Sequence, residues 1–201
     1  MPARAIRYAT LGVIHRVLRT GNRRYEFERR YLEHGDAWFY RSNPKERVKF
    51  DVLLSQTLRH ALRRRAALDV GCSIGILSAM LAKHFDNVVA FDVSREALRQ
   101  APEVQRIANL KTMVADARSF EIDETFDVVV CAGLLGYFSE VDAERVLNRI
   151  ADHLFPDGVL IIHGSKDEAT DQLGRHFRLV DKTPLPEPWG FVAAYKVDER
   201  F

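Results

Sequence analysis

From residue 66 onward, short apolar runs alternate with longer segments in which apolar residues recur at helical spacing. The runs have little polar alternation, which is typical of parallel strands covered on both faces. The pattern predicts strands at 66–70, 87–93, 110–116, 126–132 and 158–164, and helices at 76–85, 94–101 and 141–155. Such β-α alternation predicts an α/β fold with a doubly wound, mostly parallel sheet.

The end of the chain has a different pattern. Residues 176–197 read as two strands joined by a Pro-rich loop, and no helix fits between them. The last strand is therefore predicted to be antiparallel, in a seven-stranded Rossmann-like sheet. Ser94 and Asp142, which precede helical segments, are predicted N-caps.

Before residue 66 the pattern predicts helices. Residues 4–19 are predicted to form a basic amphipathic helix and residues 23–34 a second one, and Pro44 suits the first turn of a third. We therefore expect two parts: a basic helical extension or lid at 1–65 and a ligand-binding domain at 66–201.

The composition adds one feature to this predicted architecture, which is an uneven distribution of charge along the chain. The 201 residues are 47% hydrophobic and 29% charged, as in globular proteins, with no signal-peptide pattern. Two cysteines cannot form a disulfide framework, which favours the cytoplasm. Residues 1–65 hold 16 Lys and Arg against 6 Asp and Glu, whereas the rest holds 14 against 22. This asymmetry predicts either peripheral contact of residues 4–19 with an anionic membrane or a basic face that docks on the acidic domain.

The turn after the first strand is the prime candidate for a ligand site, since ligands bind beyond the carboxyl ends of parallel strands. Gly71 allows a sharp turn and close approach of a ligand, and Gly75 allows close passage of the chain. Asp69, which ends the strand region, favours a ligand with an amino group and disfavours a pyrophosphate.

Two further acids follow successive strands. Asp92 ends the second strand, 21 residues after Gly71, where an acid can accept both hydroxyls of a ribose. Asp116 follows the third strand, where it can accept from the exocyclic amine of adenine. Each acid alone is as well explained by a cap or a solvated loop, but the three in order indicate a nucleoside site.

With these residues the sequence resembles the class I S-adenosylmethionine-dependent methyltransferases over roughly 66–201. The resemblance rests on LDVGCSIG, VVAFDVS, VADARSF, FDVVVCAGLLGYF and LFPDGVLII, in the family's order. It implies that S-adenosylmethionine is bound and that S-adenosylhomocysteine is the product. The residues it assigns to the donor are Asp69, Gly71, Cys72, Ser73, Gly75, Asp92, Val93, Asp116, Ala117, Cys131 and Ala132. Cys72 and Cys131 are equally well explained as small buried residues.

Ser73 replaces the middle glycine of the family's loop. We expect it to have ordinary dihedrals at a helix start, with its hydroxyl capping or meeting the ligand. A positive φ would cost about 1–2 kcal/mol. The form GCSIG, with AWFYRSNPKERVKF and LLGYF, is similar to the NodS-like nodulation methyltransferases, which N-methylate an amino sugar of a chitin oligosaccharide.

This resemblance implies a small-molecule or glycan acceptor over the fourth and fifth strands, with an amino-sugar nitrogen or a sugar hydroxyl as methyl acceptor. The candidate catalytic residues are His163 as base, Tyr137 beside donor or acceptor, and Glu46 from the lid. Each has a structural alternative: a hydrogen-bonded histidine, core packing, and pairing with a nearby cation. No Cys, His or Asp cluster has metal-ligand spacing, so no metal is expected.

Three other functions remain as alternatives. A nicotinamide dehydrogenase is disfavoured, since GCSIG is not G-x-G-x-x-G and Asp69 opposes a pyrophosphate. A nucleic-acid methyltransferase would use the N-terminal charge, but no recognised RNA motif is present, so no nucleic-acid partner is expected. A non-catalytic binding or regulatory protein of the same fold would bind donor without turnover. The sequence gives no oligomeric state.

Overall fold

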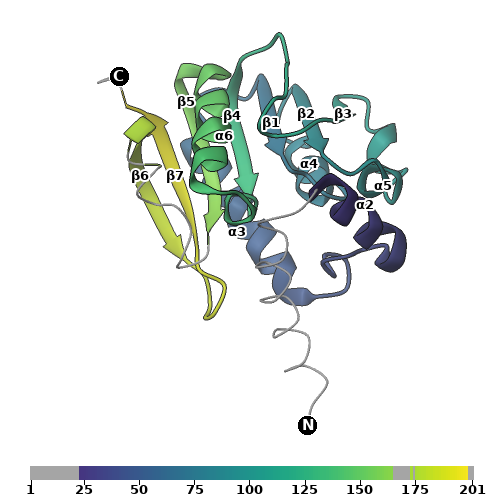
Figure 1. The fold of residues 1–201 in the computed structure, drawn as a ribbon. Helices are drawn as coiled ribbons and strands as arrows, with labels where there is room; N and C mark the ends of the chain where they lie inside the picture. Colours follow the sequence, from purple (N-terminus) through teal and green to yellow (C-terminus); the bar gives the residue numbers. More distant parts are fainter. Residues whose placement is uncertain (1–22, 165–172, 174, 199–201) are drawn as a thin grey trace.

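Seven strands form one sheet in the order β3-β2-β1-β4-β5-β7-β6 (Figure 1). This is a computed structural model that describes residues 23–164, 173 and 175–198. The strands are β1 (Ala66–Val70), β2 (Asn87–Asp92), β3 (Leu110–Val114), β4 (Phe126–Ala132), β5 (Leu154–Gly164), β6 (Phe177–Pro184) and β7 (Phe191–Val197).

Strands β1 to β5 are parallel, and β7 pairs antiparallel with both β5 and β6. The order steps outward from β1 in both directions, which is the doubly wound arrangement that the β-α alternation predicted. Both the fold class and the antiparallel last strand are confirmed. The carboxyl ends of β1, β2 and β4 lie at the same edge of the sheet, where the strand order reverses.

Alternate strand residues face two apolar layers. Ala67 and Val128 face a core shared with α3 (Pro44–His60), α4 (Ile76–Leu81) and α5 (Arg95–Arg99). Leu68 and Val129 face the opposite layer, which contains α6 (Glu140–Asp152). Two 3₁₀ turns complete the described elements, η1 (Val104–Arg106) and η2 (Leu135–Tyr137).

The helix starts follow from local capping. Ser94 caps α5 as predicted, because its side chain accepts a hydrogen bond from the N–H of Ala97. The prediction of Asp142 as a cap was wrong: Ser139 accepts from the N–H of Asp142, and α6 begins at Glu140. Asp142 instead lies in the first turn of α6, where an acid is also favourable.

The N-terminal part contributes α2 (Arg23–His34) and α3, joined by residues 35–43. Asp36 holds this connection, since its carboxylate accepts from the N–H groups of Tyr40 (2.9 Å) and Arg41 (2.7 Å). Helix α2 contacts α5, whereas α3 contacts β5 and β7 (Figure 1). Phe50 and Leu53 of α3 are buried in the core of the sheet, so the segment 44–60 is part of the folded unit.

Residues 4–19, predicted to form a basic amphipathic helix, lie outside the described residues. Their contact with an anionic membrane therefore stays a prediction. Within the described ranges, no helix combines the length and the hydrophobicity needed to cross a bilayer.

Candidate functional site

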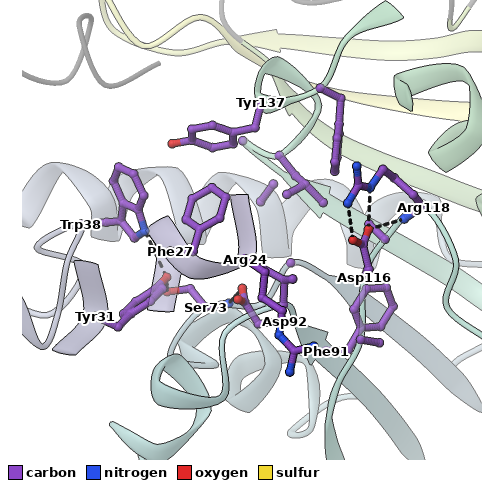
Figure 2. Close-up of a pocket in the computed structure, with 18 of the residues that line it drawn as sticks. Arg24, Phe27, Tyr31, Trp38, Ser73, Phe91, Asp92, Asp116, Arg118 and Tyr137 are labelled. Carbon is purple, nitrogen blue, oxygen red and sulfur yellow. Dashed lines mark hydrogen bonds and ion pairs between the residues drawn. The ribbon is translucent and has the colours of Figure 1, made fainter. Parts of the chain in front are cut away.

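A pocket lies beyond the carboxyl ends of β1, β2 and β4 and beneath α2 (Figure 2). It encloses about 760 Å³ of empty space, a volume that includes open solvent at its mouth. Eight of the residues predicted for the site line it: Gly71, Ser73, Asp92, Val93, Asp116, Ala117, Ala132 and Tyr137. Six do not: Asp69, Cys72, Gly75, Cys131, His163 and Glu46.

The loop after β1 has three left-handed residues in alternation, with φ of 73° at Gly71, 55° at Ser73 and 74° at Gly75. A Cβ on Gly75 would lie 2.8 Å from Val104, and one on Gly71 would lie 3.0 Å from Leu134. Both positions therefore favour glycine, because a side chain would add a close contact to the strain of a positive φ. The expectation of ordinary dihedrals at Ser73 was wrong, and its conformation costs about 1–2 kcal/mol.

Three hydrogen bonds hold Ser73 in this conformation. Its N–H donates to Asp92 Oδ2 (2.9 Å), and its Oγ accepts from the Tyr31 hydroxyl (2.6 Å). The Tyr31 oxygen in turn accepts from Trp38 Nε1 (3.0 Å), as Figure 2 shows. Together they offset the strain, because each is made by a buried or partly buried group. A third glycine would lack the acceptor for Tyr31.

Asp92 ends β2 inside the pocket. Its two carboxylate oxygens accept from the N–H groups of Ser73 and Ser94, both at 2.9 Å. Burial raises the pKa of this carboxyl to about 6, and the nearby carboxylate of Glu28 adds to the rise, while the two N–H donors oppose it. Each oxygen keeps a second lone pair, so the carboxylate can still accept from two ligand hydroxyls.

Asp69 lies behind the loop. Its side chain is 2% exposed and accepts from the Ser78 hydroxyl of α4 (2.6 Å). Burial raises the pKa of this carboxyl to about 7, against the opposing effect of the Ser78 bond. Asp69 therefore lies under the site, where its charge acts on the loop from below.

Asp116 lies in the pocket with both carboxylate oxygens bound by Arg118. Arg118 donates to Oδ1 from its main-chain N–H and from Nε, both at 2.9 Å, and to Oδ2 from Nη2 at 2.6 Å (Figure 2). Arg118 also pairs with Asp142 of α6 at 3.5 Å. The acid expected at the adenine end is thus oriented by a side chain that the sequence analysis did not include.

Aromatic side chains cover the pocket. The ring of Tyr137 packs edge-on against Phe27 at 5.3 Å between centroids and lies 6.0 Å from Trp38. Phe27 and Tyr31 were both missed by the sequence analysis. Their spacing of four residues on the predicted helix 23–34 places them on one face, and that periodicity is the signal that identifies them.

His163 and Glu46 lie beside the pocket. His163 Nε2 donates to the carbonyl of Trp189 (2.9 Å), so the lone pair is on Nδ1, which is buried without a hydrogen-bond partner. A Cβ on Gly133 would lie 3.3 Å from Nδ1, so this atom packs close to Gly133, which lines the pocket. Burial, and then the charge of Lys49, lower the pKa of His163 to about 4.

Glu46 forms an ion pair with Lys49 one turn along α3. This is the structural alternative that the sequence analysis gave for Glu46. Cys72 and Cys131 are buried free thiols, and burial raises the pKa of Cys72. Among the described residues, no group of three or more His, Cys, Asp or Glu side chains is arranged to hold a metal ion.

Comparison with known proteins finds a family model and several relatives that match part of this chain. Residues 67–158 match a family model described as a methyltransferase domain. Nodulation protein S of Rhizobium tropici is 28% identical over 152 residues, which cover 75% of this chain and 63% of that protein. The chain thus spans less than two thirds of that relative.

Solved structures agree on the fold. The N-methyltransferase NodS from Bradyrhizobium japonicum WM9, in complex with S-adenosylhomocysteine, superposes with a TM-score of 0.79 at 22% identity, covering 88% of this chain and 99% of that one. The 1,6-didemethyltoxoflavin-N1-methyltransferase of Burkholderia thailandensis gives 0.71 at 20% identity and covers 87% of both chains.

Proposed function

Since the chain belongs to the class I S-adenosylmethionine-dependent methyltransferases, we propose that it transfers the donor's methyl group to an amine nitrogen of a small-molecule or glycan acceptor. When bound, S-adenosylmethionine supplies a methyl group on a sulfonium, which is already an activated leaving group. The protein's part is then to orient the two reactants and to exclude water.

The residues of the pocket fit this donor. The observation that carries the proposal is the buried carboxylate of Asp92, fixed by two backbone N–H groups and bordering the pocket. It would accept from the ribose hydroxyls. Asp116, oriented by Arg118, and Ala117 would contact the adenine, and Gly71 and Ser73 would approach the methionine half.

The lowered pKa of His163 favours an amine over a sugar hydroxyl as the methyl acceptor. With its pKa lowered to about 4, this imidazole is too weak a base to take the proton of a hydroxyl. An amine that is already neutral needs no such base, and Nδ1 would then accept a hydrogen bond from its N–H. The names of two structural relatives support the same choice, because both are N-methyltransferases.

The acceptor class we favour is an amino sugar, because of the similarity to nodulation protein S. The test starts with calorimetric titration of S-adenosylhomocysteine into the wild-type chain, Asp92→Ala and Asp86→Ala. Asp86 is an exposed acid beside the opposite end of β2, so it is the matched control. We expect binding by the wild type and the control, and its loss in Asp92→Ala.

Methyl transfer is then measured on a chitin oligosaccharide with one free amino group and on its fully N-acetylated form. Transfer to the first alone is the expected result. Donor binding without transfer to any amine would support the non-catalytic alternative, and transfer to RNA or DNA would support the nucleic-acid alternative. Either result would overturn the proposal.

A further inference from the structure

The loop between β3 and β4 is held in place by helix α6. All residues of this loop are described, and they form no helix or strand, although Asp116 and Arg118 line the pocket. In the first turn of α6, Asp142 forms an ion pair with Arg118 at 3.5 Å. In its last turn, Arg149 donates a hydrogen bond to the carbonyl of Phe120 at 2.8 Å. The loop therefore depends on side chains of α6 for its position over the end of β3.

The side chain of Arg118 lies between two carboxylates. It donates to both carboxylate oxygens of Asp116, from Nε at 2.9 Å and from Nη2 at 2.6 Å (Figure 2). Its third nitrogen, Nη1, faces Oδ2 of Asp142. Because the guanidinium is planar, its two-point contact fixes the plane of the Asp116 carboxylate. The contact with Asp142 in turn limits where the guanidinium can lie.

The contacts of Asp142 direct one of its oxygens at Arg118. Its main-chain N–H donates to Ser139 Oγ at 3.2 Å, and its Oδ1 accepts from Arg145 of the same helix, also at 3.2 Å. The other oxygen, Oδ2, makes the contact with Arg118. The side chain of Asp142 is 19% exposed, whereas Glu140 of the same turn is exposed to solvent. Asp142 is thus fixed on a helix, unlike the loop residue that it contacts.

We infer that Asp142 is a positioning residue for recognition of the donor's base. This inference rests on the proposed donor. Through Arg118, Asp142 holds the Asp116 carboxylate in the orientation that accepts a hydrogen bond from the exocyclic amine of adenine. It thereby sets the preference for adenine over a purine that lacks this amine. Asp142 itself does not line the pocket, so its effect on the ligand passes through Arg118.

The physical reason is that a fixed acceptor discriminates better than a mobile one. A carboxylate on an unsupported loop can turn toward water when the ligand offers no donor, and the penalty is then small. The Asp116 carboxylate is held by Arg118 beside the pocket, so a ligand without the amine would cover it without giving it a hydrogen bond. The contact with Asp142 therefore raises the penalty for the wrong base.

The experiment is calorimetric titration of the full chain with S-adenosylhomocysteine and with its analogue that carries hydrogen in place of the 6-amino group. The measured quantity is the ratio of the two affinities. In the wild type we expect a preference of roughly 10- to 100-fold for the amino form. Asp142→Asn should lower this ratio roughly two- to fivefold, since its ion pair with Arg118 is partly exposed. Arg118→Gln should lower it further.

Two more variants separate position from charge. Arg118→Lys keeps the positive charge and loses the planar two-point contact, so the ratio should fall as it does in Arg118→Gln. The matched control is Glu140→Gln, which removes an acid from the same first turn of α6 and leaves the contact between Asp142 and Arg118 in place. It should keep the wild-type ratio.

Each other result overturns the inference. An equal loss of both affinities in Asp142→Asn would mean that Asp142 only supports the fold of the loop. A lowered ratio in Glu140→Gln would assign the effect to the charge at the start of α6. If the wild type bound both ligands equally, the amine would not be recognised, and the proposed donor would still stand. If it bound neither, the proposed donor itself would be wrong. Far-ultraviolet circular dichroism of each variant reports whether it is folded.

Discussion

The hydroxyl of Tyr31 donates a 2.6 Å hydrogen bond to the hydroxyl of Ser73, across 42 residues of sequence. This bond joins α2 to the loop after β1 and explains why serine occupies a position with φ of 55°. It also leaves the Ser73 proton available to a ligand, because Ser73 acts here as the acceptor. Tyr31 and Ser73 thus connect the N-terminal segment to the proposed donor site.

Replacement of Tyr31 by phenylalanine removes this connection. The Tyr31→Phe variant leaves Ser73 Oγ and Trp38 Nε1 without a partner, so we expect a loss of about 1–3 kcal/mol in the free energy of unfolding and weaker donor binding. Chemical denaturation and calorimetry measure the two effects. Tyr25→Phe is the control, since Tyr25 is 67% exposed. Equal stability of the two variants would contradict the role assigned to Tyr31.

The strain at Ser73 can be separated from its hydrogen bond by two variants. Ser73→Ala loses the hydroxyl and keeps the left-handed penalty, whereas Ser73→Gly loses both. We expect the glycine variant to be more stable than the alanine variant by about 1 kcal/mol, measured by denaturant unfolding. If alanine were equal or better, φ at this position would not be constrained as described.

The pKa of Asp69 predicts a dependence of stability on pH. Burial raises its folded-state pKa to about 7 from the ordinary value of 3.8, so the folded chain binds this proton more tightly than the unfolded chain. The contribution of Asp69 to the free energy of unfolding therefore falls as pH rises from about 4 to about 7. Asp69→Asn should flatten that decline without abolishing it, because burial also raises the pKa of Asp92. Unfolding curves at several pH values test this, with exposed Asp86→Asn retaining the wild-type slope.

His163→Ala tests the acceptor side. We expect turnover to fall roughly tenfold or more, because the acceptor amine would lose the hydrogen bond that orients it. Affinity for S-adenosylhomocysteine should stay nearly unchanged, because His163 does not line the pocket. Since its pKa is lowered to about 4, His163 should cause no loss of rate between pH 8 and pH 5. Any decline in that range should follow the acceptor amine. A fully active variant would remove His163 from the mechanism.

The basic pattern of residues 4–19 predicts reversible binding to anionic membranes. Cosedimentation with vesicles that contain an anionic lipid should capture the full chain and not a chain lacking residues 1–20. Raised salt should release it. Equal capture of both chains would contradict the prediction.

The fold could be predicted because its signals are local. The parallel sheet is predicted by valine-rich runs such as 126–132 and by the helical spacing of apolar residues between them. The antiparallel last strand is predicted because no helix fits before residues 191–197. The positions of Asp92 and Asp116 followed from the ends of strands in the same way. These features depend on residues a few positions apart.

The rest of the site depends on contacts between distant segments. The φ of Ser73 reflects its partner Tyr31, and the orientation of Asp116 depends on Arg118, which also meets Asp142 of α6. From the sequence Glu46 was a candidate catalytic acid, but in the structure its carboxylate forms an ion pair with Lys49. The spacing of residues along a helix does not show which charged side chains form ion pairs within the protein.

The connection between α2 and α3 has a geometric consequence. Helix α2 contacts α5, on the half of the sheet with the proposed donor site, and α3 contacts β5 and β7, on the half that carries His163. Residues 35–43 join the two helices, pinned by Asp36 and with a left-handed residue at Phe39. The number of residues in this link therefore limits how α2 and α3 can lie over the two halves of the sheet. An insertion there would let α2 shift over the proposed donor site while both halves of the sheet stay intact.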